Sequence, residues 1–231
     1  MHCKFYQEKK LVKGGWQFMT IVYIGNVGYP DTASSIHVRN RGIFMKTFGH
    51  EVHVLCELAS DGKRMEEVDE LTYQYMDPYP GQGKIRGAYW NLDQVFGKFY
   101  FKQTQKYIDK IKPDVVILYE PNSILYILKM LKLSKKEGFK LVIETTEWRN
   151  PKDYKGIISR VINTEKDLQK KYIDKKVGNV IAISKYLYQH YLEQNCNTIL
   201  LPPIFPEADK KKKLIRENSD NRKVLKIVYA G

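Results

Sequence analysis

Residues 20–25, Thr-Ile-Val-Tyr-Ile-Gly, form a short, continuous run of β-branched and aromatic residues that ends in glycine. A strand with one face in water alternates apolar and polar residues, whereas a strand covered on both faces is apolar throughout. The run therefore predicts a buried strand of a parallel sheet. Similar runs follow it along the chain, at residues 51–56, 71–76, 115–119, 141–145, 180–183 and 198–201.

Longer amphipathic segments separate most of these runs and predict helices at about 33–48, 91–111, 123–136, 157–176 and 185–195. Each is long enough to be a right-handed crossover between parallel strands. The alternation predicts an α/β domain with a doubly wound, mostly parallel Rossmann-like sheet and helices on both faces. Residues 77–90 are rich in proline, glycine and aromatic residues, so we expect a loop there that borders a cleft.

Composition excludes several classes of protein. The chain has 231 residues, 43% of them hydrophobic and only 15 Gly and 9 Pro, which excludes a disordered or collagenous chain. Its three cysteines are far apart and lack metal-ligand spacing, so neither a disulfide framework nor a metal site is predicted. Because no apolar run reaches the roughly 18–20 residues that span a bilayer, we expect a cytoplasmic protein, either free or peripheral at the inner face of the membrane.

The formal net charge of +13 indicates an anionic partner. No nucleic-acid recognition module accompanies the charge, so nucleic acid is not the expected partner. Lys98, Lys102, Lys106 and Lys110 recur at every fourth position, opposite a face with Phe96, Tyr100, Tyr107 and Ile111. This lysine stripe is interpreted first as a solvated helix face, and docking to an anionic membrane surface is the alternative.

The composition along the chain predicts four segments. Residues 1–18 are expected to be an extension outside the fold, and residues 19–202 the Rossmann-like domain. Residues 203–223 contain prolines followed by four consecutive lysines, which is typical of a linker. Residues 224–231, Val-Leu-Lys-Ile-Val-Tyr-Ala-Gly, predict the first strand of a further domain that this sequence does not contain.

The loop after the first strand is the first candidate site, because ligands of open α/β sheets bind at the carboxyl ends of the strands. Its backbone N–H groups and the following helix end could hold a phosphate or a sugar hydroxyl. A tight turn that merely needs glycine is the alternative, and the G-x-x-G spacing differs from the dinucleotide-binding G-x-G-x-x-G. The candidates are Gly25, Gly28, Tyr29, Ser34, Ser35, His37 and Arg39.

Polar residues after later strands are further candidates. Glu120 and Asn122 follow the run at 115–119, Glu147 and Trp148 follow 141–145, and Ser184 follows 180–183. Each has a structural alternative: Asn122 or Ser123, and likewise Ser184, as helix N-caps, and Glu147 in a surface ion pair with Arg149. No serine, histidine and aspartate triad is apparent, and no catalytic residue is assigned.

Several stretches, in this order, resemble the amino-terminal half of family-4 glycosyltransferases of the GT-B fold. They are the loop at 25–35 with Arg39, Thr-Phe-Gly-His-Glu-Val-His-Val at 47–54, Lys-Pro-Asp-Val-Val at 112–116, Val-Ile-Ala-Ile-Ser-Lys-Tyr-Leu at 180–187 with Leu-Pro-Pro at 201–203, and Lys-Ile-Val-Tyr-Ala-Gly at 226–231. Together they extend over residues 20–231. Each is weakly specific alone, and the combination carries the resemblance.

The resemblance implies a retaining glycosyltransferase that transfers a sugar from a nucleotide-sugar donor, without a further cofactor, to a sugar or lipid-linked acceptor. It implies a role in bacterial surface polysaccharide or glycolipid synthesis, with this chain as the acceptor-side half, inactive alone. Related enzymes often place histidine where this chain has Glu147, which leaves the role of that position open. A non-catalytic Rossmann-like binding module and a fragment of a GT-B-type sugar-nucleotide epimerase are the alternatives.

Overall fold

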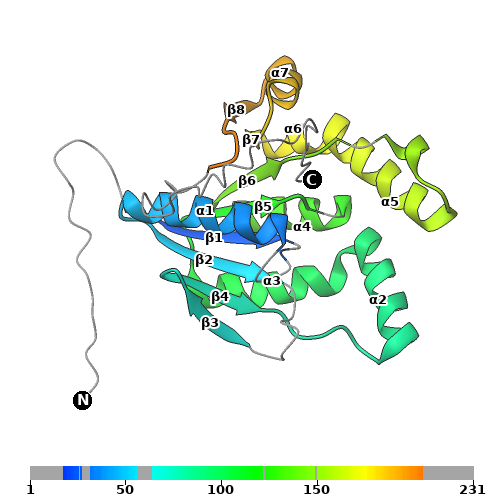
Figure 1. Ribbon diagram of the computed structural model, residues 1–231, viewed down its shortest axis with the longest axis horizontal. Helices are drawn as coiled ribbons and strands as arrows, with labels where there is room; N and C mark the ends of the chain where they lie inside the picture. Colours follow the sequence, from blue (N-terminus) through cyan, green and yellow to red (C-terminus); the bar gives the residue numbers. More distant parts are fainter. Residues whose placement is uncertain are drawn as a thin grey trace, which may run out of the picture.

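One eight-stranded sheet forms the centre of the protein (Figure 1). A computed structural model describes residues 18–25, 27, 32–56, 64–121, 123–148 and 150–204. The strand order is β3-β4-β2-β1-β5-β6-β7-β8, and all neighbours are parallel except β3 and β4. The strands are β1 (Thr20–Gly25), β2 (Glu51–Cys56), β3 (Met65–Val68), β4 (Leu71–Tyr75), β5 (Val115–Tyr119), β6 (Lys140–Thr145), β7 (Asn179–Ala182) and β8 (Asn197–Leu200).

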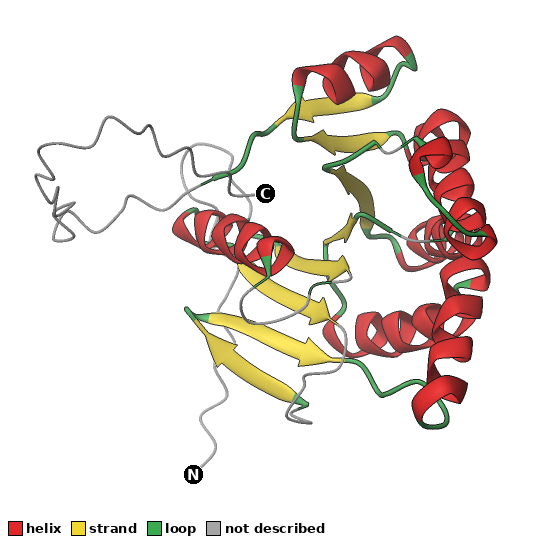
Figure 2. Cartoon of the chain, turned by 45° about the vertical axis from the view of Figure 1, so that its right-hand side comes forward, coloured by secondary structure: helices red, strands yellow, loops and turns green. Residues whose placement is uncertain are grey.

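Helices cover both faces of this sheet, as the sequence predicts. Figure 2 shows α1 on one side of the sheet and most of the other helices on the opposite side. The helical elements are α1 (Ala33–Thr47), α2 (Gly83–Phe96), α3 (Lys98–Ile111), α4 (Ile124–Glu137), the 3-10 turn η1 (Pro151–Asp153), α5 (Ile157–Leu168), the π-helical turn η2 (Gln169–Ile173), α6 (Asp174–Val177) and α7 (Lys185–Glu193).

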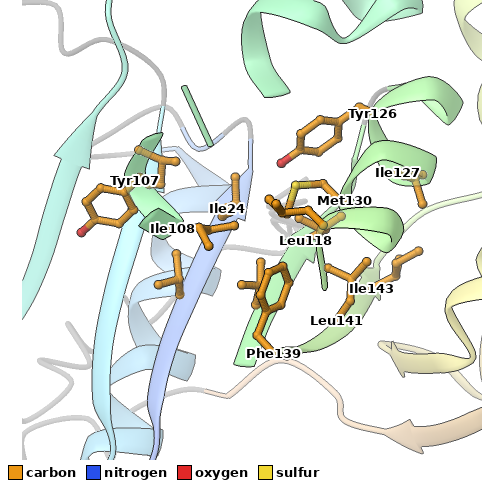
Figure 3. Packing of buried hydrophobic residues seen from close by; sticks show 14 of the residues in the cluster. Ile24, Tyr107, Ile108, Leu118, Tyr126, Ile127, Met130, Phe139, Leu141 and Ile143 are labelled. Atoms are coloured by element: carbon orange, nitrogen blue, oxygen red, sulfur yellow. The ribbon is translucent and has the colours of Figure 1, made fainter. Parts of the chain in front are cut away.

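Alternate residues of the buried strands pack on opposite faces of the sheet. Val22 and Ile24 of β1 join a cluster with side chains of α3 and α4, among them Ile108 and Met130 (Figure 3). Ile21 and Tyr23 of the same strand join a second cluster on the α1 side. Burial on both faces explains why these strands are apolar throughout. The doubly wound, mostly parallel fold predicted from the sequence is therefore confirmed.

Three predicted elements differ from the structure. Residues 83–90 are not loop, because α2 begins at Gly83 and only residues 77–82 are irregular. The predicted helix at 91–111 is interrupted at Gly97, whose left-handed φ of 54° ends α2 and starts α3. Phe96 therefore lies outside the apolar face of α3 and is 54% exposed. The predicted helix at 157–176 changes register through the π-helical turn η2.

An additional strand, β3, pairs antiparallel with β4 at the edge of the sheet. Its sequence, Met-Glu-Glu-Val, is too polar to predict a buried strand, and half of it is exposed. The predicted extension at 1–18 and the linker and strand at 203–231 lie outside the described residues, except for residue 18 and residues 203–204.

Candidate functional site

The sheet changes winding direction between β1 and β5. The chain moves from β1 outward through β2 to β4, then returns to β5 on the other side of β1. The carboxyl ends of β1 and β5 therefore diverge at this point, where doubly wound sheets leave a crevice for ligands. A narrow hollow with about 20 Å³ open to water lies there, lined by residues that include Gly25, Gln94, Tyr100, Tyr119 and Glu120, and we call it the switch-point crevice.

Gly25 allows β1 and β5 to approach each other closely at the crevice. A Cβ atom on Gly25 would lie 2.9 Å from both the Cβ and the carbonyl oxygen of Tyr119. Glycine is therefore required there by packing. Burial raises the pKa of Tyr119 to about 12, so its hydroxyl stays protonated at neutral pH.

A second hollow adjoins the crevice and shares Tyr79 and Tyr100 with it. Its other lining residues come mainly from the segment 76–90, with Arg86 and Trp90 of α2 among them. The predicted cleft next to residues 77–90 is thus present, although helix α2 forms much of its wall. The lining is largely aromatic and apolar, with Asp77 and Arg86 as its charged groups.

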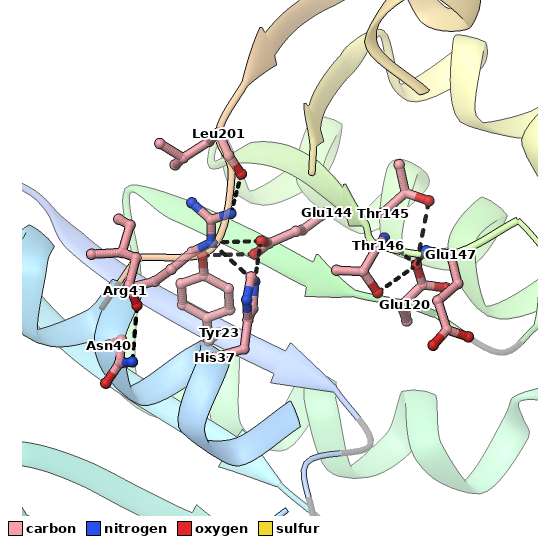
Figure 4. Close-up of polar contacts among 11 residues, drawn as sticks. Tyr23, His37, Asn40, Arg41, Glu120, Glu144, Thr145, Thr146, Glu147 and Leu201 are labelled. Carbon is pink, nitrogen blue, oxygen red and sulfur yellow. Dashed lines mark hydrogen bonds and ion pairs between the residues drawn. The ribbon is translucent and has the colours of Figure 1, made fainter. Parts of the chain in front are cut away.

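Glu120, directly after β5, lies between the crevice and a smaller hollow. Its carboxylate accepts hydrogen bonds from the backbone N–H groups of Thr146 and Glu147 (Figure 4). Lys170 Nζ lies 3.4 Å from its Oε2. Burial raises the pKa of Glu120, but Lys170 and the two N–H groups outweigh it, so the net pKa is lowered. Glu120 is therefore an ionised carboxylate that remains 19% exposed.

The smaller hollow is lined by Glu120, Glu147, Trp148, Lys166, Asp167 and Lys170, and we call it the side hollow. Trp148 is held in place, because its Nε1 donates to Asp167 at 2.9 Å and its ring meets His190 at a centroid distance of 4.4 Å. Glu147 is exposed and contributes its backbone N–H to Glu120. Carboxylates, lysines and an indole ring are thus arranged around one small space.

A second carboxylate, Glu144 near the end of β6, is completely buried. His37 Nε2 and Arg41 Nε of α1 each lie 2.7 Å from its Oε1, and Tyr23 of β1 donates to Oε2 at 2.9 Å (Figure 4). Arg41 Nε also lies 3.0 Å from His37 Nε2, so the two α1 side chains contact each other as well as Glu144. Burial and the neighbouring Glu144 raise the pKa of Tyr23 well above its ordinary value.

The same stretch of α1 binds the chain that follows β8. Arg41 Nη2 donates to the carbonyl oxygen of Leu201, and Asn40 Nδ2 donates to that of Ile204 at 2.9 Å. Arg41 is only 1% exposed. These contacts fix the chain after the last strand against the α1 side of the domain.

The structure places the candidate residues of the first loop and its helix in different environments. Ser34 and Ser35 take part in the N-cap of α1 with Thr32, and His37 joins Glu144. Arg39 instead forms an ion pair with Asp69, in the turn between β3 and β4, at 3.4 Å. Gly28 and Tyr29, and likewise Asn122, lie outside the described residues.

Several serines act as helix caps, as the structural alternatives predicted. Ser123 Oγ accepts from Tyr126 N at the start of α4, and Ser184 Oγ accepts from Leu187 N at the start of α7. Asp93 performs this role for α3, since its carboxylate accepts from the N–H groups of Phe99 and Tyr100. The cap explains why a charged residue is buried at the end of α2.

The structure therefore brings together Gly25, Glu120, Glu147 and Trp148 along the carboxyl edge of the sheet. Sequence reasoning did not select Tyr23 or Lys170, and it did not pair Glu144 with Arg41. Two signals for that pairing were available: a glutamate inside an otherwise apolar run, and a histidine and an arginine four residues apart on one helix. Chemically, the edge offers a fixed carboxylate, lysines, and aromatic surfaces, which suit hydrogen bonding and stacking to a polar ring.

Lysines 98, 102, 106 and 110 all lie exposed on α3, in agreement with a stripe. Among the residues that the structure describes, no group of three or more metal-ligating side chains is present, and no helix is both long and apolar enough to traverse a lipid bilayer.

Comparisons with solved structures show where this fold occurs. Sucrose-phosphate synthase from Thermosynechococcus elongatus matches with a TM-score of 0.50 at 13% identity, over 79% of this chain and 48% of that one. Os79 from O. sativa, solved in complex with UDP, matches with a TM-score of 0.51 at 9% identity, over 81% of this chain and 52% of that one. This chain thus spans about half the length of each.

No protein-family model and no curated protein matches this sequence. At the identities above, the likeness shows the fold alone. The chain has the fold of one Rossmann-like half of a GT-B glycosyltransferase.

Proposed function

We propose that this chain is the acceptor-side half of a retaining, family-4-like glycosyltransferase. In this proposal it binds a sugar or lipid-linked acceptor and works with a second α/β domain that holds a nucleotide-sugar donor. The observation that carries the proposal is the switch-point crevice, which ends on the ionised carboxylate of Glu120 in a fold shared with half of a sucrose-phosphate synthase.

The polar groups along this edge suit an acceptor sugar. Glu120 is oriented by backbone N–H groups, so its position needs no reorganisation when a hydroxyl group binds. Tyr79, Trp90 and Tyr100 provide aromatic surfaces in the adjoining hollow. Sugar hydroxyls bind carboxylates and amides, while the apolar side of the ring packs on aromatic residues.

The finer parts of the proposal follow from the sequence. The acceptor belongs to bacterial surface polysaccharide or glycolipid synthesis, and the reaction takes place in the cytoplasm, at the inner face of the membrane when the acceptor carries a lipid. Transfer requires donor and acceptor to be held together. The 231-residue chain is therefore expected to bind acceptor sugars without transferring sugar to them.

Two measurements test this. Saturation-transfer NMR on the 231-residue chain should detect binding of simple sugars, and transfer from UDP-glucose and related donors should appear only when the chain is joined to a donor-binding α/β domain. Turnover by the 231-residue chain itself would overturn the two-domain proposal. If the two-domain protein interconverts nucleotide-sugars without transferring them, the epimerase alternative is correct. If neither activity nor sugar binding is found, the chain is a binding module of another kind.

A further inference from the structure

Four large apolar side chains on α2 are exposed to solvent on one face of the helix. They occupy positions i, i+4, i+7 and i+11, which align along a single stripe. The α2 stripe consists of Ile85 (62% exposed), Tyr89 (49%), Leu92 (56%) and Phe96 (54%). Trp90 and Arg86 of the same helix instead line the aromatic hollow, so the stripe is the side of α2 turned away from it.

A second exposed apolar set lies on α5, which contacts α2. Ile157 is 83% exposed, Ile158 60% and Val161 50%. The start of α4 adjoins both helices: Glu165 of α5 accepts from Ile124 N at 2.9 Å, and Leu125 beside it is 43% exposed. Both views place α2 and α5 at the same end of the molecule (Figures 1 and 2). We call the α2 stripe, Leu125 and the three α5 residues the apolar face.

Charged residues near the apolar face are mainly cationic. The exposed cations are Lys84 on α2 and Lys152, Lys155 and Arg160 before and on α5, and the exposed Asp153 lies between the first two of the latter group. The carboxylates of the two helices already have partners within the protein. Asp93 caps α3, Glu165 accepts from Ile124 N, and Asp167 accepts from Trp148 and Lys171.

We propose that the apolar face docks on an anionic lipid bilayer, with α2 and α5 lying at the interface between headgroups and acyl chains. Exposed apolar residues bordered by lysine and arginine fit such a surface, since apolar burial and attraction to anionic headgroups act together. A second copy of the chain is a poorer occupant, because each copy carries a net charge of +13.

Docking would also place the crevice next to the bilayer. Gln94 and Gly97, at the end of α2, line the switch-point crevice. An acceptor anchored in the membrane could then present its headgroup to Glu120 while its lipid stays in the bilayer. This consequence for the acceptor rests on the proposed function, whereas binding to a lipid surface does not.

The test is vesicle binding by the full chain. Cosedimentation is measured with phosphatidylcholine vesicles that contain phosphatidylglycerol and with pure phosphatidylcholine vesicles. The variant Ile85→Gln/Leu92→Gln/Phe96→Gln should bind the anionic vesicles at least about tenfold more weakly than the wild type, because it removes much of the apolar area that inserts. Phe44→Gln is the matched control: Phe44 is 43% exposed on α1, outside the apolar face, and its replacement should change nothing.

A second measurement reports contact directly. Phe96→Trp should be quenched by brominated lipids in anionic vesicles, whereas Phe44→Trp should not. Unchanged binding by the triple variant, equal quenching at both positions, or a loss of binding caused equally by Phe44→Gln would overturn the proposal. So would a change in oligomeric state in the triple variant, which would assign the face to protein contact. Lipid binding without any sugar transfer would leave this inference standing and overturn only the proposed function.

Replacing Lys102, Lys106 and Lys110 by Gln separates the apolar face from the lysine stripe of α3. These lysines have no exposed apolar side chains beside them on α3. Their replacement should therefore weaken vesicle binding less than the triple substitution on α2 does. A larger loss would assign docking to the lysine stripe and overturn the inference.

Discussion

Glu144 and Glu120 lie at the carboxyl ends of the neighbouring strands β6 and β5, yet their surroundings differ. Glu144 is fully buried and is held by side chains from β1 and α1, namely Tyr23, His37 and Arg41. Glu120 accepts from backbone N–H groups and threonine hydroxyls at the end of β6 and in the loop after it, and it borders both the crevice and the side hollow. The first carboxylate joins elements of the fold, and the second faces space that a ligand can occupy.

The difference shows why residue type and strand position alone do not identify a site. Both glutamates follow apolar strand residues at the carboxyl edge, where ligands bind in this class of sheet. What separates them is exposure: the Glu144 side chain is fully buried, whereas the Glu120 side chain remains 19% exposed beside the two hollows. Variants that remove neighbouring side chains should therefore affect stability around Glu144 and ligand binding around Glu120.

The largest expected effect is on stability and comes from Arg41→Ala. Arg41 lies against Glu144 at 2.7 Å and is 1% exposed, so its loss leaves a buried carboxylate without its cation. Breaking such a pair lowers the free energy of unfolding by about 3–5 kcal/mol. Urea denaturation followed by circular dichroism measures the change.

Arg39→Ala is the matched control for this variant, because Arg39 lies two residues away on the same helix. Its side chain is 36% exposed and its ion pair with Asp69 is 3.4 Å long, so the expected loss is about 1 kcal/mol or less. Equal losses in the two variants would show that the Glu144 cluster does not hold α1 to the sheet.

Asp174 allows a pH-dependent test of stability near Glu120, because Lys170 interacts with both carboxylates. Burial raises the pKa of Asp174 from 3.8 to about 6, although Lys170, Tyr191 and Gln169 act in the opposite direction. The folded state thus keeps the Asp174 proton more tightly than the unfolded state. Its contribution to stability is complete below about pH 4 and is lost as the pH rises from about 4 to 6.

Asp174→Asn should remove this dependence. The difference in free energy of unfolding between wild type and variant should change by about 3 kcal/mol across that pH window, in favour of the variant at higher pH. Urea titrations at pH 4, 5, 6 and 7 measure it. A constant difference between the two proteins would show that Asp174 titrates alike in the folded and unfolded states.

The strands were predictable because each carries its own apolar signal. Residues 115–119, Val-Val-Ile-Leu-Tyr, coincide with β5, since burial on both faces leaves no polar interruption, and residues 51–56 coincide with β2 although Glu51 and His53 are polar. The first part of helix α2, residues 83–90, was missed because Pro78, Pro80, Gly81 and Gly83 predict a loop that extended too far along the chain. The hollow under α2 and its contacts with α4 and α5 are long-range features, which local propensity does not contain.

The candidate site was predictable only in part, for a related reason. Glu120, Glu147 and Trp148 were found because they directly follow strands. Arg41 was not found, since its role depends on Glu144, which is 103 positions later in the sequence. Pairing between distant residues leaves no periodic pattern in either segment.

Two glycines test the close approach of β1 and β5 beside Glu120. Gly25→Ala should destabilise the protein by about 1–3 kcal/mol, because its Cβ would lie 2.9 Å from Tyr119. Gly87→Ala on α2 has no atom within 4 Å of the added Cβ and should stabilise by about 0.5–1 kcal/mol. Thermal unfolding compares the two. If both substitutions are neutral, β1 and β5 are able to separate at this edge.

The smallest expected change in stability accompanies a change in function, at Glu147. Its side chain is exposed and borders the side hollow, so Glu147→Gln should alter the free energy of unfolding by no more than about 0.5 kcal/mol. In the two-domain glycosyltransferase that we propose, a carboxylate that accepts a hydrogen bond from the acceptor sugar makes kcat/KM fall about 10- to 100-fold when it is replaced, as for loss of a charge-assisted hydrogen bond. Glu193→Gln, an exposed carboxylate on α7, is the control and should leave both quantities unchanged. Wild-type kinetics in Glu147→Gln would instead favour the surface ion pair with Arg149. Ligand contact at this edge would then be limited to Glu120 and the residues of the switch-point crevice.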